Sequence, residues 1–263
     1  MAVTGTAVAV AVTLPGSAGA DEAPRAGAGA PGSTVSGAQG ETRGDGQAPG
    51  PAALASAPPE GEKGVGTDPL TADELKRAEA LAMTPPASPS GVPPATAQRN
   101  AEGGRGPQRL GTELADPAPG ESAGGPRRAQ VRFYDYGRDE LITRTVNLDT
   151  GRVEQSGAQR GVQPSAHPEE LRAALELILA DPLGKGVKED YKDATGRELT
   201  SPDQLWFNGD VYRTYREAHV PAPLAKCGEH RCVRLVTKVK NGAWIDTRKL
   251  IVDLSARTVT RVG

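Results

Sequence analysis

The stretch Val146-Asn147-Leu148-Asp149-Thr150-Gly151-Arg152-Val153 decides the fold of this chain, because a looser copy returns near the C-terminus as Val252-Asp253-Leu254-Ser255-Ala256-Arg257-Thr258-Val259. In the first copy, apolar and polar residues alternate around an Asp-Thr-Gly segment. Such alternation is typical of a half-buried strand, and Asp-Thr-Gly favours a tight turn. We therefore predict a strand, a turn and a second strand at both places, and so two similar β-units.

Large apolar side chains are concentrated in the second half of the chain. Residues 1–127 hold 17 of the 23 prolines and 22 of the 33 glycines, but none of the nine aromatic residues. A segment of this composition cannot bury enough surface to offset the cost of about 1–2 kcal/mol per residue for fixing its backbone. We expect most of it to be unfolded. The 136 residues that follow are enough for one compact core.

The charge of the chain argues against a nucleic-acid partner. There are 9 basic and 14 acidic residues before position 128, and 22 basic and 19 acidic residues after it. Neither half carries the clustered positive charge that binding to nucleic acid requires. We therefore expect no nucleic-acid binding.

The first 20 residues look like a bacterial export signal. Residues 7–14 are mostly apolar, and Ala18-Gly19-Ala20 has the small-x-small pattern of a cleavage site. The apolar run is shorter than the roughly 20 residues that a membrane-spanning helix needs. No Lys or Arg precedes it, so either the true start lies upstream and a basic region is missing, or this is an Ala/Val-rich disordered start. We expect a secreted, extracellular protein without stable membrane insertion.

Composition and patterning divide the chain into four parts. Residues 1–20 are the signal-like segment, and residues 21–66 form an Ala/Gly/Pro-rich disordered tether. A first unit of one helix and three strands covers 67–161, with a disordered insertion at about 85–127. A second helix-plus-sheet unit covers 162–263.

The helix of the first unit has clear signals at its start. Thr71 and Glu74 form a capping box, and Leu70 and Leu75 are placed as the hydrophobic staple around it. This pattern predicts a helix over residues 72–82, which a pair of prolines soon ends. Its narrow apolar stripe predicts that it packs on another element.

The remaining elements follow from periodicity and turn residues. Two helices are expected to follow the first three strands. One begins at Pro168, and the other covers about 187–195. Two Asn-Gly pairs, Asn208-Gly209 and Asn241-Gly242, each predict a β-hairpin. In the second hairpin the alternation fails at residues 246–249, where we expect a bulge or an exposed edge. The predicted strands lie at 128–136, 141–148, 152–156, 204–207, 211–215, 233–240, 243–254 and 258–262.

The order of these elements predicts an α+β fold, in which helices cover antiparallel sheets. The helix start Leu70-Thr71-Ala72-Asp73-Glu74-Leu75, with the distant strand-turn-strand at 146–153, resembles the non-catalytic N-terminal modules of copper amine oxidases and the related PepSY-type modules. The resemblance implies two cystatin-like units. The chain is also similar to exported actinobacterial proteins of unassigned activity. The Asn-Tyr-acid and His-x-His motifs for quinone and copper do not occur, so the resemblance implies no cofactor.

The two cysteines form the most distinctive local motif. In an exported protein, Cys227 and Cys232 are expected to form a disulfide that closes a tight loop and stabilises the fold by about 2 kcal/mol. A metal site of both cysteines with His230 would have only three ligands. A redox site would need Cys-x-x-Cys at a helix start. We predict the disulfide and no metal.

Four aromatic residues suggest a binding surface. Trp206, Phe207, Tyr212 and Tyr215 cluster around one predicted hairpin. Because neighbouring residues of a strand face opposite sides, Trp206 and Phe207 should lie on opposite faces, one packed and one exposed. An exposed Trp/Tyr face would bind a partner. The alternative is that helices cover both faces.

No catalytic motif supports a specific enzyme class. Gly-x-Ser-x-Gly, a Walker loop and His-Glu-x-x-His are all absent from the sequence. The first hypothesis is a secreted, non-enzymatic module that binds an extracellular protein, for example as an inhibitor or modulator of an enzyme. One alternative is an extracellular hydrolase that uses His219 or His230 with a nearby carboxylate. The other is a structural cell-wall protein.

Overall fold

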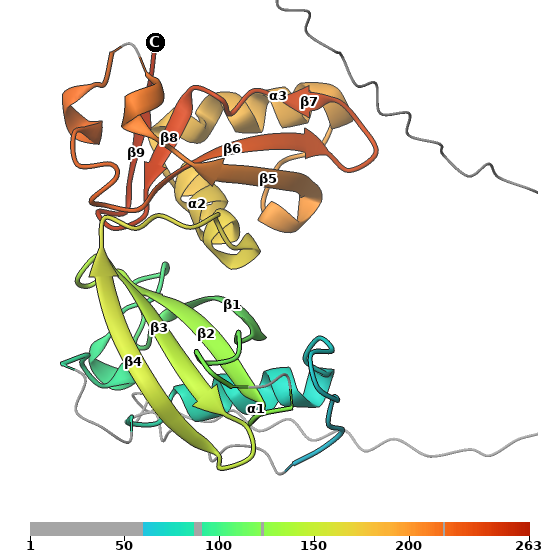
Figure 1. The fold of residues 1–263 in the computed structure, drawn as a ribbon. Helices are drawn as coiled ribbons and strands as arrows, with labels where there is room; N and C mark the ends of the chain where they lie inside the picture. The colour runs from blue at the N-terminus through green and yellow to red at the C-terminus, as the bar shows by residue number, and fades with distance from the viewer. Residues whose placement is uncertain (1–59, 87–90, 122–123, 218) are drawn as a thin grey trace, which may run out of the picture. The chain divides into compact units, whose positions relative to one another are not determined.

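The computed structural model of this chain describes residues 60–86, 91–121, 124–217 and 219–263. They contain two antiparallel β-sheets with a few helices (Figure 1), so the predicted α+β class is confirmed. The signal-like segment and most of the predicted tether lie outside the described residues.

The first sheet has four strands and one helix. Its helix begins where the capping box predicts: the Thr71 hydroxyl accepts a hydrogen bond from the Glu74 N–H, and the Glu74 carboxylate accepts one from the Thr71 N–H. Apolar residues of the helix pack on the sheet. The elements are α1 (Ala72–Ala82), β1 (Gln108–Leu114), β2 (Arg128–Asp135), β3 (Glu140–Asn147) and β4 (Arg152–Arg160), with the strands in the order β1-β2-β3-β4.

Two segments that we expected to be disordered belong to this unit. The expectation for residues 85–127 is wrong for β1 and for the short 3-10 helix η1 (Ala95–Ala97), so the sheet has four strands instead of three. β1 contains few large apolar residues, and its pairing with β2, rather than a local pattern, makes it a strand. Residues 60–66 of the predicted tether contact α1, since the Gly64 N–H donates to the Glu74 carboxylate at 3.1 Å.

The second sheet has five strands, and two helices pack against it. Its first helix opens as predicted, with His167 as N-cap residue and Pro168 in the first turn. The next helix ends at Gly196, which has the left-handed φ of 70°. The strand order is β5-β6-β8-β9, and β7 also pairs with β6. The elements are α2 (Pro168–Ala180), α3 (Lys185–Thr195), β5 (Leu205–Val211), β6 (Cys232–Val239), β7 (Trp244–Ile245), β8 (Leu250–Asp253) and β9 (Thr258–Arg261).

Only one of the two Asn-Gly pairs forms a hairpin. The prediction at Asn208-Gly209 is wrong, because β5 runs through this pair and stays in register with β6 along its length. A Cβ at position 209 would lie 2.4 Å from the Arg234 carbonyl oxygen, so glycine permits a close strand approach here. The prediction at Asn241-Gly242 is confirmed by the β6–β7 hairpin, with Asn241 at φ 58°. The bulge or exposed edge predicted at 246–249 lies where β7 ends and β8 has not yet begun, so the predicted strand over 243–254 is interrupted there.

The repeated stretch forms its turn as predicted in both units. In the first unit the turn joins β3 to β4, and the Leu148 N–H donates to the Arg127 carbonyl at 2.9 Å. The Arg127 N–H donates to the Asp149 carboxylate at 3.1 Å. The Arg127 side chain then binds the Glu74 carboxylate at the start of α1, with Nε 2.5 Å from Oε1 and Nη2 2.9 Å from Oε2.

The second unit repeats these contacts, with the Ser255 hydroxyl in place of the Asp149 carboxylate. The turn joins β8 to β9, and the Leu254 N–H donates to the Arg231 carbonyl at 3.0 Å. The Arg231 N–H donates to the Ser255 hydroxyl at 3.0 Å. The Arg231 side chain binds Glu170 at the start of α2, with Nε 2.5 Å from Oε1 and Nη2 2.7 Å from Oε2. The two units therefore share one arrangement. The turn hydrogen-bonds to the backbone of an arginine, and the side chain of that arginine binds a glutamate at the start of the helix.

The buried side chains form three clusters. One lies between α1 and the first sheet, and a larger one surrounds α2 and the second sheet. The large cluster also contains Tyr134 and Leu141 of the first sheet and Tyr136 of the turn after β2, so the two sheets share buried contacts. The small third cluster lies beside the disulfide and consists of Tyr212, Leu224, Cys227, Cys232 and Ile251.

Candidate functional site

One face of the second sheet packs on its helices. Alternation along the strands turns the other face outward, except where the small cluster beside the disulfide covers it. Val233 and Leu235 of β6 are fully buried in the core around α2. Trp206 in β5 and Trp244 in β7 lie on the other face and are 41% and 67% exposed. Neighbouring apolar side chains that form a patch on a surface point to a binding site, whereas single ones do not.

The two tryptophans lie on either side of one lysine. In the strand register, Lys238 of β6 is the direct partner of both Trp206 and Trp244. The indole centroids are 5.9 Å apart with an interplanar angle of 88°, and the Lys238 Nζ lies 5.2 Å from one ring and 5.6 Å from the other. Cation–π contacts of this kind hold the ammonium group in place. We call these three residues the tryptophan–lysine cluster.

An arginine-lined groove continues from this cluster along β6. Arg234 is four residues from Lys238 on the same face, which is about 13 Å along a strand. Its guanidinium lies 5.2 Å from the Tyr212 ring centroid and 2.8 Å from the Glu217 carboxylate. Val236 lines two cavities. The cavity at the arginine end has a volume of about 540 Å³, and the cavity beside Trp244 has a volume of about 470 Å³. We call this surface the outer groove.

The four predicted aromatic residues separate into two pairs. Trp206 and Tyr215 are exposed, Tyr215 to 75% in the 3-10 helix η4 (Thr214–Arg216). Phe207 packs against the large core and Tyr212 is buried in the small one. Sequence reasoning missed Lys238 and Trp244, because only the pairing of β5, β6 and β7 brings them beside Trp206.

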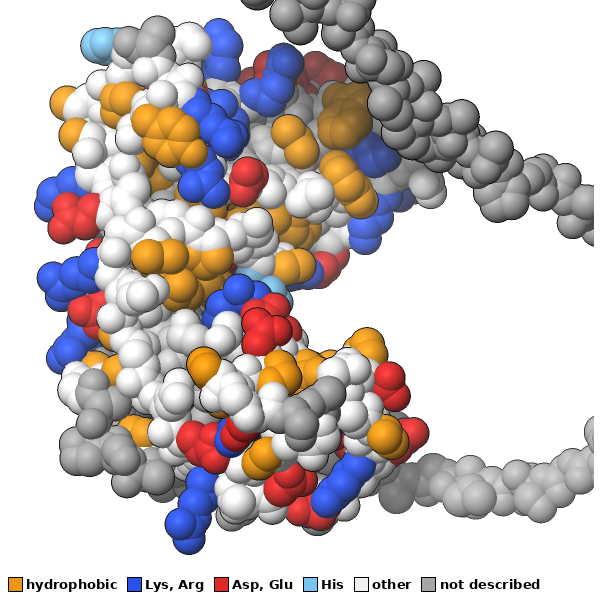
Figure 2. All heavy atoms as spheres, in the orientation of Figure 1, with side chains coloured by type: hydrophobic (Ala, Val, Ile, Leu, Met, Phe, Trp, Pro, Cys, Tyr) orange, Lys and Arg blue, Asp and Glu red, His pale blue; other side chains and the backbone are white. Residues whose placement is uncertain are grey.

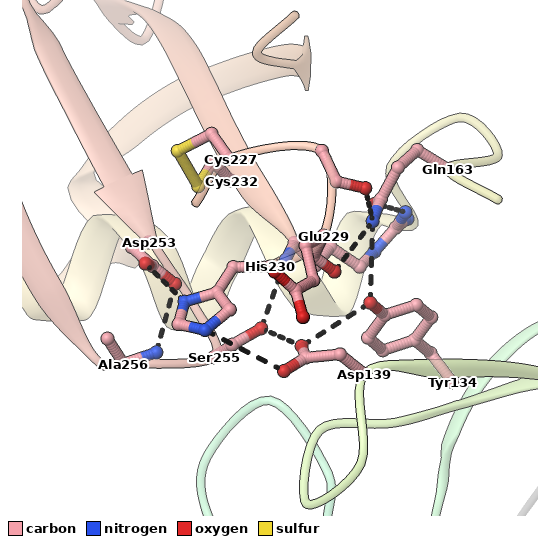
Figure 3. Close-up of a disulfide and its surroundings, with 12 residues drawn as sticks. Tyr134, Asp139, Gln163, Cys227, Glu229, His230, Cys232, Asp253, Ser255 and Ala256 are labelled. Carbon is pink, nitrogen blue, oxygen red and sulfur yellow. Dashed lines mark hydrogen bonds and ion pairs between the residues drawn. A yellow bond between two sulfur atoms is a disulfide. The ribbon is translucent and has the colours of Figure 1, made fainter. Parts of the chain in front are cut away.

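The predicted disulfide between Cys227 and Cys232 is formed, with the two Cα atoms 5.5 Å apart. It closes the loop that leads into β6 (Figure 3). The two cysteines belong to the small core. Both sulfurs are therefore unavailable as metal ligands or as redox thiols. Within the described residues, no group of three or more His, Cys, Asp and Glu side chains could hold a metal ion.

Replacing both cysteines with serine should lower the free energy of unfolding by about 2 kcal/mol, because the cross-link restricts the unfolded chain over only a short loop. Urea unfolding of the double variant measures the loss. Reduction of the wild-type protein serves as the control and should produce the same shift. A variant that unfolds at the wild-type urea concentration would contradict the stabilising role of the bond.

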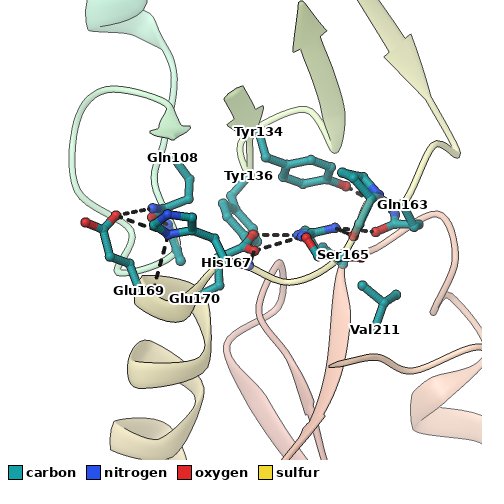
Figure 4. A network of polar contacts seen from close by, with 12 residues as sticks. Gln108, Tyr134, Tyr136, Gln163, Ser165, His167, Glu169, Glu170 and Val211 are labelled. Carbon is teal, nitrogen blue, oxygen red and sulfur yellow. Dashed lines mark hydrogen bonds and ion pairs between the residues drawn. The ribbon is translucent and has the colours of Figure 1, made fainter. Parts of the chain in front are cut away.

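A buried ion pair lies at the start of α2 (Figure 4). The side chains of Arg231 and Glu170 are both 0% exposed, and Tyr136 donates its hydroxyl hydrogen to Glu170 at 2.5 Å. Arg231 also donates to the Gln163 side chain, and its guanidinium lies 5.2 Å from the Tyr134 ring centroid. Burial alone would lower the pKa of Arg231, but its contact with Glu170 raises it. Arg231 therefore remains charged, and this network is structural.

His230 lies beside two carboxylates (Figure 3). Its Nδ1 is 2.8 Å from the Asp253 carboxylate, and its Nε2 is 4.0 Å from Asp139. Burial raises the pKa of Asp139, although its contacts with Ser255 and His230 lower it in part. The Ser255 hydroxyl donates a hydrogen bond to the Asp139 carboxylate and accepts one from the Arg231 N–H. Its proton and its oxygen therefore both take part in hydrogen bonds. His219, the other predicted histidine, is exposed.

Charges of both signs are interspersed on the face of the molecule that Figure 2 shows. None of the helices in the described part of the chain is long and apolar enough to cross a membrane.

Comparisons with known proteins identify no family. No family model matches the chain, and no curated protein matches it. Among solved structures, one similar chain is a copper-containing benzylamine oxidase from Hansenula polymorpha, with 14% identity and a TM-score of 0.42. The match covers 75% of this chain and 29% of the oxidase chain, so this protein spans less than a third of that enzyme's length.

Proposed function

We propose that this chain is a secreted, non-enzymatic module that binds an extracellular protein through the outer groove and the tryptophan–lysine cluster. An inhibitor or modulator of an extracellular enzyme is one form of this function. The observation that carries the proposal is the exposure of Trp206 and Trp244 on one sheet face, with the Lys238 ammonium between them.

The composition of this face matches that of protein-binding surfaces. Trp, Tyr and Arg dominate the residues that contribute most to protein–protein affinity. Here Trp206, Trp244, Tyr215, Arg216 and Arg234 lie on or beside the groove. The Arg216 guanidinium is 5.7 Å from the Tyr215 ring centroid, so these side chains support each other.

The partner is expected to bind to the sheet face rather than to its edge. β5 pairs only with β6 among the described strands, which leaves its other edge open. However, the N–H groups of Gly209 and Val211 donate to the side chains of Asn208 and Asp210, at 2.8 and 2.7 Å. These amides are therefore not free to bind an added strand.

The hydrolase alternative has one supporting observation, the hydrogen bond between His230 and Asp253. An enzyme of this kind also needs a nucleophile or water that the histidine can activate. The engaged Ser255 hydroxyl does not supply the nucleophile. The binding module is therefore the better-supported function, and His230 is best explained as a link between neighbouring turns.

Replacing Trp206 and Trp244 together with alanine should lower capture of the partner at least tenfold, since these side chains supply most of the apolar contact area. The full chain is immobilised, the culture supernatant of the source organism is passed over it, and captured proteins are quantified by mass spectrometry. A captured enzyme is then assayed with and without the chain.

The matched control replaces Gln155 and Gln159, which are exposed on β4 of the first sheet, with alanine. This variant should capture as much partner as wild type. Equal capture by the tryptophan variant, with an unchanged urea unfolding curve, would refute the proposed surface. Recovery of wall glycan alone would favour the cell-wall alternative.

A further inference from the structure

We infer that the outer groove binds an acidic segment of a protein in extended conformation, with carboxylates placed at Lys238 and at the arginine end. This inference rests on the proposed function and specifies the chemistry of the partner. Three observations carry it: cations without acidic partners, the spacing of the cations along β6, and the geometry of the tryptophan pair.

Two cations of this surface have no carboxylate beside them. Among the described residues, Lys238 contacts only the two indole rings, and Arg216 contacts the Tyr215 ring. In contrast, Arg248 at the far side of the cluster is paired with Asp246. A cation that is held in place by aromatic rings, yet lacks a counter-ion, is suited to bind an incoming carboxylate.

The spacing of the cations favours an extended peptide. Lys238 and Arg234 are four residues apart on one strand face, about 13 Å, which equals the distance between residues i and i+4 of an extended chain. Arg234 is already paired with Glu217 at 2.8 Å, so among the described residues the unpaired cation at this end is Arg216, which lines the same cavity as Arg234. Val236 lies between them and lines both cavities. An acidic side chain at each end, with small residues between, would follow the groove along β6.

The tryptophan geometry argues against a glycan. Sugar rings stack on flat aromatic surfaces, but the two indoles meet at 88° and form no common platform. The edge-to-face pair instead forms a corner around the Lys238 ammonium. An acidic polysaccharide, which would share the charge of an acidic peptide, is therefore tested as the competing ligand.

Intrinsic fluorescence offers a direct test, because Trp206 and Trp244 are the only tryptophans of the chain. The full chain is titrated with a ten-residue peptide in which Glu recurs at every fourth position with Ser between, with the matched peptide in which Gln replaces Glu, and with polygalacturonate. We expect a saturable fluorescence change with the Glu peptide and at least tenfold weaker binding of the Gln peptide. Raising the salt from about 0.05 to 0.5 M should weaken binding of the Glu peptide at least tenfold.

The variant Lys238→Gln should weaken binding of the Glu peptide at least tenfold. Lys76→Gln, at an exposed position of α1, should leave it unchanged. Equal binding of the Glu and Gln peptides, or binding that is insensitive to salt, would overturn the inference. So would a response to polygalacturonate alone. If the peptides fail while capture of a secreted protein still depends on the tryptophans, the proposed function stands and only the acidic chemistry is refuted.

Discussion

Replacing Arg231 with methionine should lower the free energy of unfolding by about 3–5 kcal/mol, the loss typical of a broken buried ion pair. The guanidinium and the Glu170 carboxylate are both 0% exposed. Removal of the arginine leaves the carboxylate buried without its counter-ion, and the carbonyls before α2 lose their donor as well. Urea unfolding, followed by circular dichroism, measures the loss.

The chain contains its own control for this prediction. Arg127 makes the same bidentate contact with Glu74, but the two side chains are 10% and 6% exposed and lie nearer to solvent. Arg127→Met should therefore cost less than Arg231→Met. Adding Glu170→Gln to Arg231→Met should recover part of the loss, because no charge then remains buried. Equal losses for the two single variants would contradict the role of burial.

Replacing Gly184 with alanine should cost about 3 kcal/mol, the upper range for overpacking a core. Gly184 is buried in the 3-10 helix η2 (Pro182–Gly184) between α2 and α3. A Cβ there would lie 1.9 Å from the Ile178 carbonyl oxygen and 2.9 Å from its carbonyl carbon. These are backbone atoms of the last turn of α2, so the clash cannot be relieved by rotating a side chain. Thermal and urea unfolding measure the loss.

Gly186 is the matched control, two residues further along the chain. It lies inside α3, and a Cβ at this position would meet nothing within 4 Å. Gly186→Ala should therefore stabilise the protein by about 0.5–1 kcal/mol, because alanine loses less backbone entropy in a helix. Equal free energies of unfolding for Gly184→Ala and Gly186→Ala would refute the clash at position 184.

Local patterns determined several helices and turns of the fold and the disulfide. The capping box at Thr71 and Glu74 predicted the start of α1, and the helical periodicity after Pro168 predicted α2. The two copies of the repeated stretch form the predicted turns, and the cysteine pair forms the predicted disulfide. Each of these features depends on residues close together in sequence, so a pattern within a few residues is sufficient to predict it.

Only the tertiary structure decided the features that depend on distant partners. β1 is a strand because β2 lies beside it, and the Asn208-Gly209 pair lies within β5 because its glycine permits close approach to β6. The pairing of Arg231 with Glu170 joins residues 61 positions apart. The tryptophan–lysine cluster exists because three strands place Trp206, Lys238 and Trp244 in one row. Strand pairing and burial bring such residues together, and neither is encoded in the local pattern of the chain.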